Sequence, residues 1–226
     1  MKNLILATIL SLTSLVTFAQ NKDERKLSDF DRLSVGQSID VIIEYGNENK
    51  AVVETSGVDV EDVITEVNGG KLTIEMERGS YRMIDVTVYL TYKKLNNIRV
   101  SSSASLKGES ILKSSDLRIK VSSSARVNLE IETGDLQVAV SSSGRLTLYG
   151  QATKQTLDVS SSGRYSAYDL KSKIVEVDIS SSGRAEVYVT EALMANASSS
   201  GRVSYKGDPN KVIADNSSSG KVRKAE

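Results

Sequence analysis

The sequence predicts an all-β protein that folds as a single-stranded right-handed parallel β-helix, a solenoid with coils of about 19 residues and an irregular N-terminal cap. Two observations predict this fold. A serine triplet followed by Ala or Gly recurs along the second half of the chain, beginning at Ser101, Ser122, Ser141, Ser160, Ser180, Ser198 and Ser217. Such regular spacing is typical of solenoids, in which each repeat forms one coil. Between triplets, apolar and polar residues alternate, which indicates β-strands.

The triplets are predicted to line a narrow inner corner of each coil. The alternation of Leu117, Ile119 and Val121 continues with the same parity to Ala125 and Val127. Counted in this way, the middle serine of each triplet faces inward, where only a small side chain fits. The predicted inner ladder consists of Ser102, Ser123, Ser142, Ser161, Ser181, Ser199 and Ser218. A catalytic role for these serines is disfavoured, because the chain has no histidine to activate them.

The N-terminal half keeps the strand pattern but lacks the triplet. Asn68-Gly69-Gly70 separates two apolar runs and predicts a tight turn. Terminal repeats of solenoids are atypical because they cap an open core. Residues 27–226 are therefore predicted to be one domain, with 27–100 as irregular first coils and cap and 101–226 as the seven coils with serine triplets.

The N-terminal segment, 1–19, is predicted to be a signal peptide. Lys2 supplies the charged start, the segment 4–18 is largely apolar, and Ala19 ends a plausible cleavage site. The segment 20–26 would then be a short linker. The mature protein is expected in the periplasm or on the surface of a bacterium, and no later stretch is apolar enough to span a membrane.

Composition excludes several classes of site. The chain has no cysteine, which rules out disulfides, thiolate metal sites and a lipidated cysteine. Its 29 basic residues balance 29 acidic ones, so no overall charge favours nucleic acid. We expect no cofactor and no metal.

Residues at equivalent positions of successive coils form columns on a β-helix, and two such columns are candidate ligand-binding sites. The first contains outward-facing arginines: Arg126, Arg145, Arg164, Arg184 and Arg202. The second contains Tyr149, Tyr168 and Tyr188. Arginine forks bind carboxylates or sulfates, and tyrosine rings could pack against sugars. The alternative is that both columns only shield and stabilise strands.

Four segments give the chain a family resemblance: DFDRLSVGQSIDVIIEYG, VNGGKLTIE, VTVYLTYKKLNNIRVSSSASLKG and the serial VSSSGR motif. Together they resemble the head GIN domain family, over nearly the whole mature chain. The resemblance implies a right-handed β-helix, export to a bacterial envelope and a role as an auto-transporter adhesin.

These observations lead to three functional hypotheses. The first is an exported non-enzymatic surface protein, an adhesin that binds a glycan or a partner protein through a flat face. The second is a polysaccharide lyase or hydrolase that uses Asp158, Asp178 and Asp215 with Arg164. The third is a homo-oligomer that assembles through the exposed coil end near Asn216.

Overall fold

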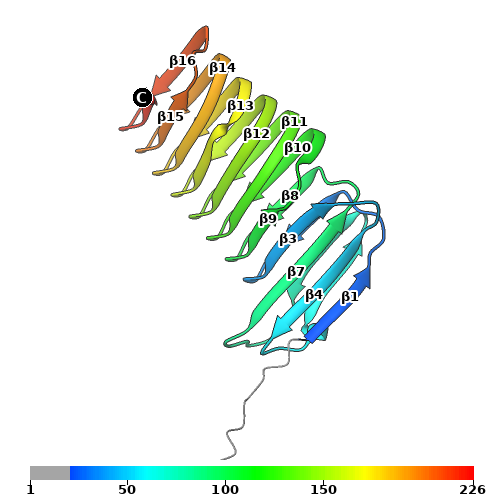
Figure 1. The fold of residues 1–226 in the computed structure, drawn as a ribbon. Helices are drawn as coiled ribbons and strands as arrows, with labels where there is room; N and C mark the ends of the chain where they lie inside the picture. The colour runs from blue at the N-terminus through cyan, green and yellow to red at the C-terminus, as the bar shows by residue number, and fades with distance from the viewer. Residues whose placement is uncertain (1–20) are drawn as a thin grey trace, which may run out of the picture.

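The computed structural model describes residues 21–226, which form an elongated β-solenoid with a cap at its N-terminal end (Figure 1). The predicted signal peptide and its cleavage site lie outside the described residues. Within residues 21–226, the helical structure is one 3₁₀ turn, Val60–Asp62, and no helix is long and apolar enough to cross a membrane.

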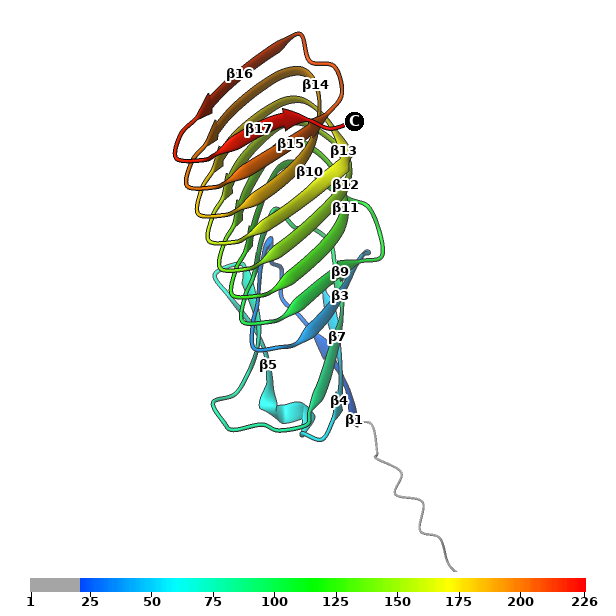
Figure 2. The same cartoon turned by 90° about the vertical axis from the view of Figure 1, so that its left-hand side faces the viewer.

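Each regular coil is one long strand that runs from one serine turn to the next and bends near its middle (Figure 2). The long strands are β10 (Leu112–Val121), β11 (Arg126–Val140), β12 (Arg145–Val159), β13 (Arg164–Ile179) and β14 (Arg184–Ala197). Each pairs in parallel with its neighbours, so that Arg126 lies opposite Arg145 of the next coil. The predicted solenoid with coils of about 19 residues is confirmed.

The core is a set of aliphatic columns between the two halves of each coil. Leu117, Ile119 and Val121 are buried, as are Val127 and Leu129 beyond the turn. The alternating residues that face outward are mainly polar or charged. Burial of these aliphatic side chains, at about 25 cal/mol per Å², is the main force that stacks the coils.

The prediction of an inner serine ladder is wrong, because the middle serines are exposed. This applies to Ser102, Ser123, Ser142, Ser161, Ser181, Ser199 and Ser218. The second and third serines of every triplet have positive φ, between 46° and 55° and between 60° and 66° respectively. Two consecutive left-handed residues turn the chain sharply, so counting by twos along an extended strand does not hold across them.

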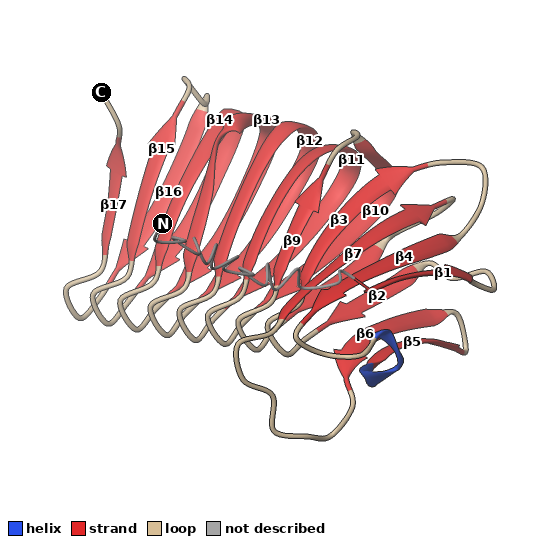
Figure 3. Ribbon diagram, turned by 60° about the horizontal axis from the view of Figure 1, so that its bottom comes forward, coloured by secondary structure: helices blue, strands red, loops and turns tan. Residues whose placement is uncertain are grey.

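The serine turns are held together by main-chain hydrogen bonds. In the turn at Ser122–Ala125, the amide of Ala125 donates to the carbonyl of Ser122 at 3.1 Å, as in a type I′ turn. The amide of Ser124 donates to the carbonyl of Ser142 in the next coil at 3.0 Å. Equivalent bonds link all the turns along one edge of the solenoid (Figure 3).

The residue after each triplet is the true inner corner. Ala104 and Ala125 are fully buried there, and glycine takes the place in later coils. A Cβ on Gly163 would lie 2.6 Å from the carbonyl oxygen of Val140. The corner therefore admits little more than a methyl group.

A regular coil precedes the first serine triplet. It consists of β2 (Arg32–Val35) and β3 (Asp40–Tyr45), which pair in parallel with β8 (Asn97–Val100) and β9 (Ser105–Gly108). Gln37 and Ser38 have φ of 57° and 60°, and the amide of Ser38 donates to the carbonyl of Ser102 at 2.9 Å. Part of the region predicted to be irregular thus has the same turn with a different sequence.

The cap consists of one strand that precedes that coil in the chain and four strands inserted between that coil and the next. It comprises β1 (Asn21–Lys26), β4 (Lys50–Ser56), β5 (Val63–Asn68), β6 (Lys71–Met76) and β7 (Asp85–Tyr92). β1, β4 and β7 pair antiparallel, and β7 joins the solenoid through parallel pairing with β3. β5 and β6 form a hairpin whose turn contains Gly69 and Gly70, both with positive φ, as the sequence predicts.

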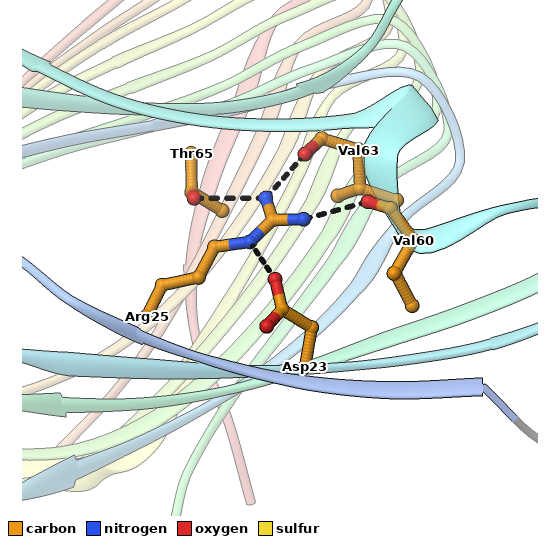
Figure 4. A network of polar contacts seen from close by, with 5 residues as sticks. All are labelled: Asp23, Arg25, Val60, Val63 and Thr65. Atoms are coloured by element: carbon orange, nitrogen blue, oxygen red, sulfur yellow. Dashed lines mark hydrogen bonds and ion pairs between the residues drawn. The ribbon is translucent and has the colours of Figure 1, made fainter.

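Asn21–Lys26 is strand β1, so the prediction of a linker over residues 20–26 is wrong for this stretch. Arg25 fastens the strand to the cap (Figure 4). Its guanidinium donates to Asp23 at 2.7 Å, to the carbonyl of Val60 at 2.6 Å and to Thr65 at 3.0 Å. A polar sequence can form an edge strand when its main chain and a half-buried arginine find partners in this way.

The last coil is β15 (Arg202–Lys206), β16 (Lys211–Asn216) and β17 (Lys221–Lys224). Val212 lies opposite the buried Leu193, yet it is 43% exposed. The inward side of β16 is therefore open to solvent within the described chain, whereas Val203 of β15 is buried.

Candidate functional site

The serine turns and the residues just after them form a polar strip along the solenoid. The strip, called the serine strip below, consists of the second and third serines of the seven turns and the column of cations two residues beyond them. Since the turns stack through main-chain bonds, the coils present their serines in the same orientation, and each turn after the first is followed by a cation, whereas Ser105 takes that position after the first turn. Stacked strands place successive copies about 4.8 Å apart.

The cations form one uninterrupted column, called the basic column. Strand register places six residues directly opposite one another in sequence: Arg126, Arg145, Arg164, Arg184, Arg202 and Lys221. All six side chains are exposed. Of the eleven ion pairs among residues 21–226, none involves a member of the basic column.

Stacking like charges without counter-charges is unfavourable. Unit charges about 4 Å apart repel by about 1 kcal/mol in water, less when salt screens them. The serines also occupy a backbone region that costs an L-residue roughly 1–2 kcal/mol. These costs are concentrated on one exposed edge, which makes the strip a candidate functional site.

A shallow hollow lies at the C-terminal end of the basic column. It has a volume of about 300 Å³ and is lined by Arg184, Arg202, Lys221 and Arg223, together with Glu186 and Ser204. Arg223 lies on the same outward face of β17 as Lys221. The positive charge of the strip is therefore densest in the last two coils.

The tyrosines do not form the column that the sequence suggests. Tyr149 lies opposite Asp169, because a register shift between Thr147 and Tyr149 displaces Tyr168. Tyr188 lies opposite Lys171. Each tyrosine is half-buried and has a different neighbour: Tyr149 donates to Asn128, and Lys206 lies 4.7 Å from the ring centre of Tyr168.

The acidic side chains considered for catalysis lie on the other side of the turns. Asp158, Asp178 and Asp215 form a column with Asn196, before the serine turns, and line a hollow of about 280 Å³. Asn196 donates to Asp178 at 2.8 Å. Arg164 comes after the turn, in the basic column. Among residues 21–226, no cluster of three His, Cys, Asp or Glu side chains could hold a metal ion.

Sequence reasoning missed the exposure of the middle serine of each triplet and a polar groove at the bends. The serines were assigned to the core by parity, and serine gives little sign of a left-handed conformation, which favours Gly, Asn or Asp. The groove depends on where each coil bends, and its residues share no motif.

Comparison with known proteins identifies the family. The family described as "Putative auto-transporter adhesin, head GIN domain" matches residues 29–209. No curated protein matches the chain in sequence.

Several solved structures share the fold. A "putative adhesin" from Bacteroides fragilis superposes with a TM-score of 0.79 at 19% identity, covering 92% of this chain and 98% of that one. A "putative adhesin" from Parabacteroides merdae superposes with a TM-score of 0.76 at 19% identity, covering 92% of this chain and 96% of that one. A "Putative lipid binding protein" from Parabacteroides distasonis superposes with a TM-score of 0.71 at 24% identity, covering 92% of this chain and 97% of that one. On the match over residues 29–209, the chain belongs to the head GIN domain family of putative auto-transporter adhesins.

Proposed function

We propose that the protein is an exported, non-enzymatic adhesin of a bacterial envelope that binds an acidic polymer, such as a charged glycan, along the serine strip. One observation carries the proposal: six stacked cations face solvent without an ion pair among residues 21–226. A polyanion would supply the missing counter-charges.

The geometry suits a repeating ligand. Arginine binds carboxylate and sulfate through two parallel hydrogen bonds, and the adjacent serine hydroxyls can donate or accept further bonds. Each exposed contact is weak, at about 0–1 kcal/mol. A column of them gains from multivalency, because after the first contact the remaining ones form intramolecularly.

Export rests on the signal peptide predicted for the N-terminal segment and on the family's description as adhesins. The relative from P. distasonis carries the printed name of a lipid-binding protein. The serine strip consists of cations and hydroxyls, which favours a polyanion over an acyl chain.

The test is binding to a sulfated or uronate-rich polysaccharide, measured by biolayer interferometry at several salt concentrations. The triple variant Arg145→Ala, Arg164→Ala, Arg184→Ala should bind at least about tenfold more weakly and show a smaller salt dependence. The control is Arg78→Ala, Arg82→Ala, Lys94→Ala, which removes three exposed cations of the N-terminal half. Equal binding by both triple variants would refute a role for the strip.

The lyase or hydrolase hypothesis is less well supported. The candidate acids Asp158, Asp178 and Asp215 form a ladder before the turns, whereas Arg164 follows its turn. Acid–base catalysis needs groups that converge on one bond. Release of unsaturated or reducing ends from an acidic polysaccharide would revive this hypothesis.

A second candidate role, self-association, is favoured by the open last coil. Ile213 is 48% exposed on β16. If two copies of β16 paired antiparallel about Ile213, Lys211 of one would face Asp215 of the other, and inward residues would meet inward residues. Light scattering of the wild type and of Ile213→Lys tests this role: a dimer only in the wild type supports it, and a monomeric wild type rejects it.

A further inference from the structure

A polar groove runs along the solenoid at the bends, which lie midway between successive serine turns. Its volume is about 770 Å³, and its lining extends over five coils, from Lys113 of β10 to Thr190 of β14. At about 4.8 Å per coil, it is about 19 Å long. The serine turns and the bends are at different edges of each coil (Figure 2), so the groove and the serine strip are separate.

The floor of the groove is a column of small residues. Ser114, Thr133, Ala152 and Ser172 lie opposite one another in successive coils. The last three are at most 8% exposed. Their small size leaves the space that longer side chains would fill.

The side chains that flank the floor are long and exposed. The preceding column contains Lys113, Glu132, Gln151 and Lys171. Thr153 and Lys173 line the other side. Ammonium, amide, hydroxyl and carboxylate groups thus surround a floor that consists of small, mostly hydroxylated residues.

A buried polar network supports the floor from inside the core. The hydroxyl of Tyr165 donates to Oε1 of Gln155 at 2.6 Å, and Nε2 of Gln155 donates to Oγ of Ser172 at 2.5 Å. All three residues are at most 2% exposed. Gln155 interrupts a column that is otherwise aliphatic, with Leu136 before it and Val175 after it.

The buried network fixes the position of Ser172 at the floor of the groove. Because Ser172 accepts a hydrogen bond from Gln155, its own hydroxyl hydrogen must point elsewhere. Polar groups are costly in an aliphatic core unless they are bonded to one another, at about 1–3 kcal/mol per unsatisfied group. The network thus holds the Ser172 side chain in one position at the floor.

The charge of the groove is only partly neutralised. Lys113 pairs with Glu132 at 2.9 Å, and Lys173 pairs with Glu191 at 3.4 Å. Lys171 makes no ion pair with any residue that the structure describes. The groove therefore offers one ammonium group without a counter-charge in the described chain, among hydroxyl and amide groups.

We propose that this groove is a second glycan site, which binds a linear oligosaccharide that carries carboxylates. The hydroxyl and amide groups match sugar hydroxyls, and Lys171 matches a carboxylate. A neutral sugar would leave Lys171 without a counter-charge, and an apolar ligand would cover the exposed Lys171 ammonium and Gln151 amide without replacing their hydrogen bonds to water. The site is separate from the serine strip and does not depend on it.

The test is titration with an oligogalacturonate long enough to span the groove, followed by calorimetry, with a neutral galactose oligomer of equal length as comparison. The wild type should bind only the acidic oligomer. The variant Gln151→Ala, Lys171→Ala should lose affinity by at least about tenfold. The control Gln137→Ala, Lys120→Ala removes the same residue types from exposed positions outside the groove and should bind normally.

Two further variants separate this site from the strip and from a purely structural network. In Arg145→Ala, Arg164→Ala, Arg184→Ala, which removes the contacts of the strip, the groove should still bind the oligomer, and adding Gln151→Ala, Lys171→Ala should remove this remaining binding; loss of all binding in the arginine variant alone would move the ligand to the strip. Gln155→Leu, Tyr165→Phe should fold, because leucine matches its column, yet should bind more weakly. Unchanged affinity in this variant or in Gln151→Ala, Lys171→Ala, or equal affinity for the neutral oligomer, would overturn the proposal.

Discussion

The two edges of each coil are built on different principles. At the serine turns the backbone hardly varies: the bonds from each third serine to the next middle serine are 2.9 to 3.1 Å long in every coil. At the bends the register shifts, at Tyr149 between β12 and β13 and again at Lys171 and Ile174 between β13 and β14. One edge repeats and the other varies.

The serine turns fix the register of the coils, whereas the bends accommodate differences in length. Every triplet has three serines, so the small differences in length between one coil and the next arise outside the turns. The turns keep the coils in step, and the bends take up extra residues such as Tyr168 without disturbing the stack. A scaffold that tolerates change at one edge can acquire binding sites there, and the groove lies at that edge.

The largest expected effect comes from filling the inner corner of a serine turn. In Gly163→Leu the side chain would collide with the carbonyl oxygens of Val140 and Ser160, which lie 2.6 and 2.9 Å from the position that a Cβ would take. We expect a loss of about 3 kcal/mol in the free energy of unfolding, measured by urea denaturation. Gly163→Ala should cost less, because Ala104 and Ala125 occupy the equivalent corner of the first coils, although its methyl group also requires the carbonyl of Val140 to shift. If the leucine variant had the wild-type midpoint of urea denaturation, the edge formed by the serine turns would not be rigid.

A smaller loss is expected when only the turn backbone is strained. Ser162→Val places a β-branched residue at a φ of 61°, and we expect it to destabilise the protein by about 2 kcal/mol. Thr153→Val, at an exposed position of the bend, should change stability by less than about 0.5 kcal/mol. Equal midpoints in denaturant for the two variants would remove the distinction between the edges.

The sequence predicts the repeating parts of the structure better than the parts that vary. Period and alternation are properties of the repeating part, so they predict the solenoid, the arginine register and the turn at Gly69 and Gly70. They fail where the backbone leaves the extended conformation. Two left-handed serines reverse the expected orientation of Ser142, and a register shift moves Tyr168 out of the column of Tyr149.

Other features need tertiary information. The coil at Gly36–Ser38 lacks the triplet, and its only sequence signal is the spacing of Val35 and Ile39, which matches that of Val100 and Ala104. The contacts of Arg25 explain strand β1, and they join parts of the chain that are far apart in sequence. The network at Gln155 joins both halves of the core, which no local pattern encodes.

Alkaline pH should destabilise the protein through two buried phenols, Tyr92 and Tyr165, neither of which belongs to a serine turn. Burial raises the pKa of Tyr165 above its usual value, and burial likewise raises the pKa of Tyr92 in the cap to about 12. Below about pH 10 both forms of the chain keep these phenols neutral, so their contribution to stability is complete. As the pH rises further the unfolded chain loses the protons first, and stability falls.

For Tyr92 the loss should be about 1 kcal/mol at about pH 11. Urea titrations at about pH 9 and 11 measure it, and absorbance at 295 nm follows phenolate formation. Tyr92→Phe and Tyr165→Phe should each reduce the pH dependence, whereas Ser162→Val should keep the wild-type slope. If both phenylalanine variants kept the wild-type pH dependence of stability, Tyr92 and Tyr165 would not be its cause.

The smallest expected effect concerns the unpaired charges of the serine edge. Arg164 has like-charged neighbours on both sides, Arg145 and Arg184. Arg164→Gln should therefore stabilise the protein by a few tenths of a kcal/mol at low ionic strength, and the gain should vanish at about 0.5 M salt. Lys173→Gln at the bend should instead destabilise the protein slightly at low ionic strength, since it removes the ion pair with Glu191. If Arg164→Gln were destabilising at every salt concentration, packing of the arginine stem would outweigh repulsion, and the basic column would need no ligand to explain it.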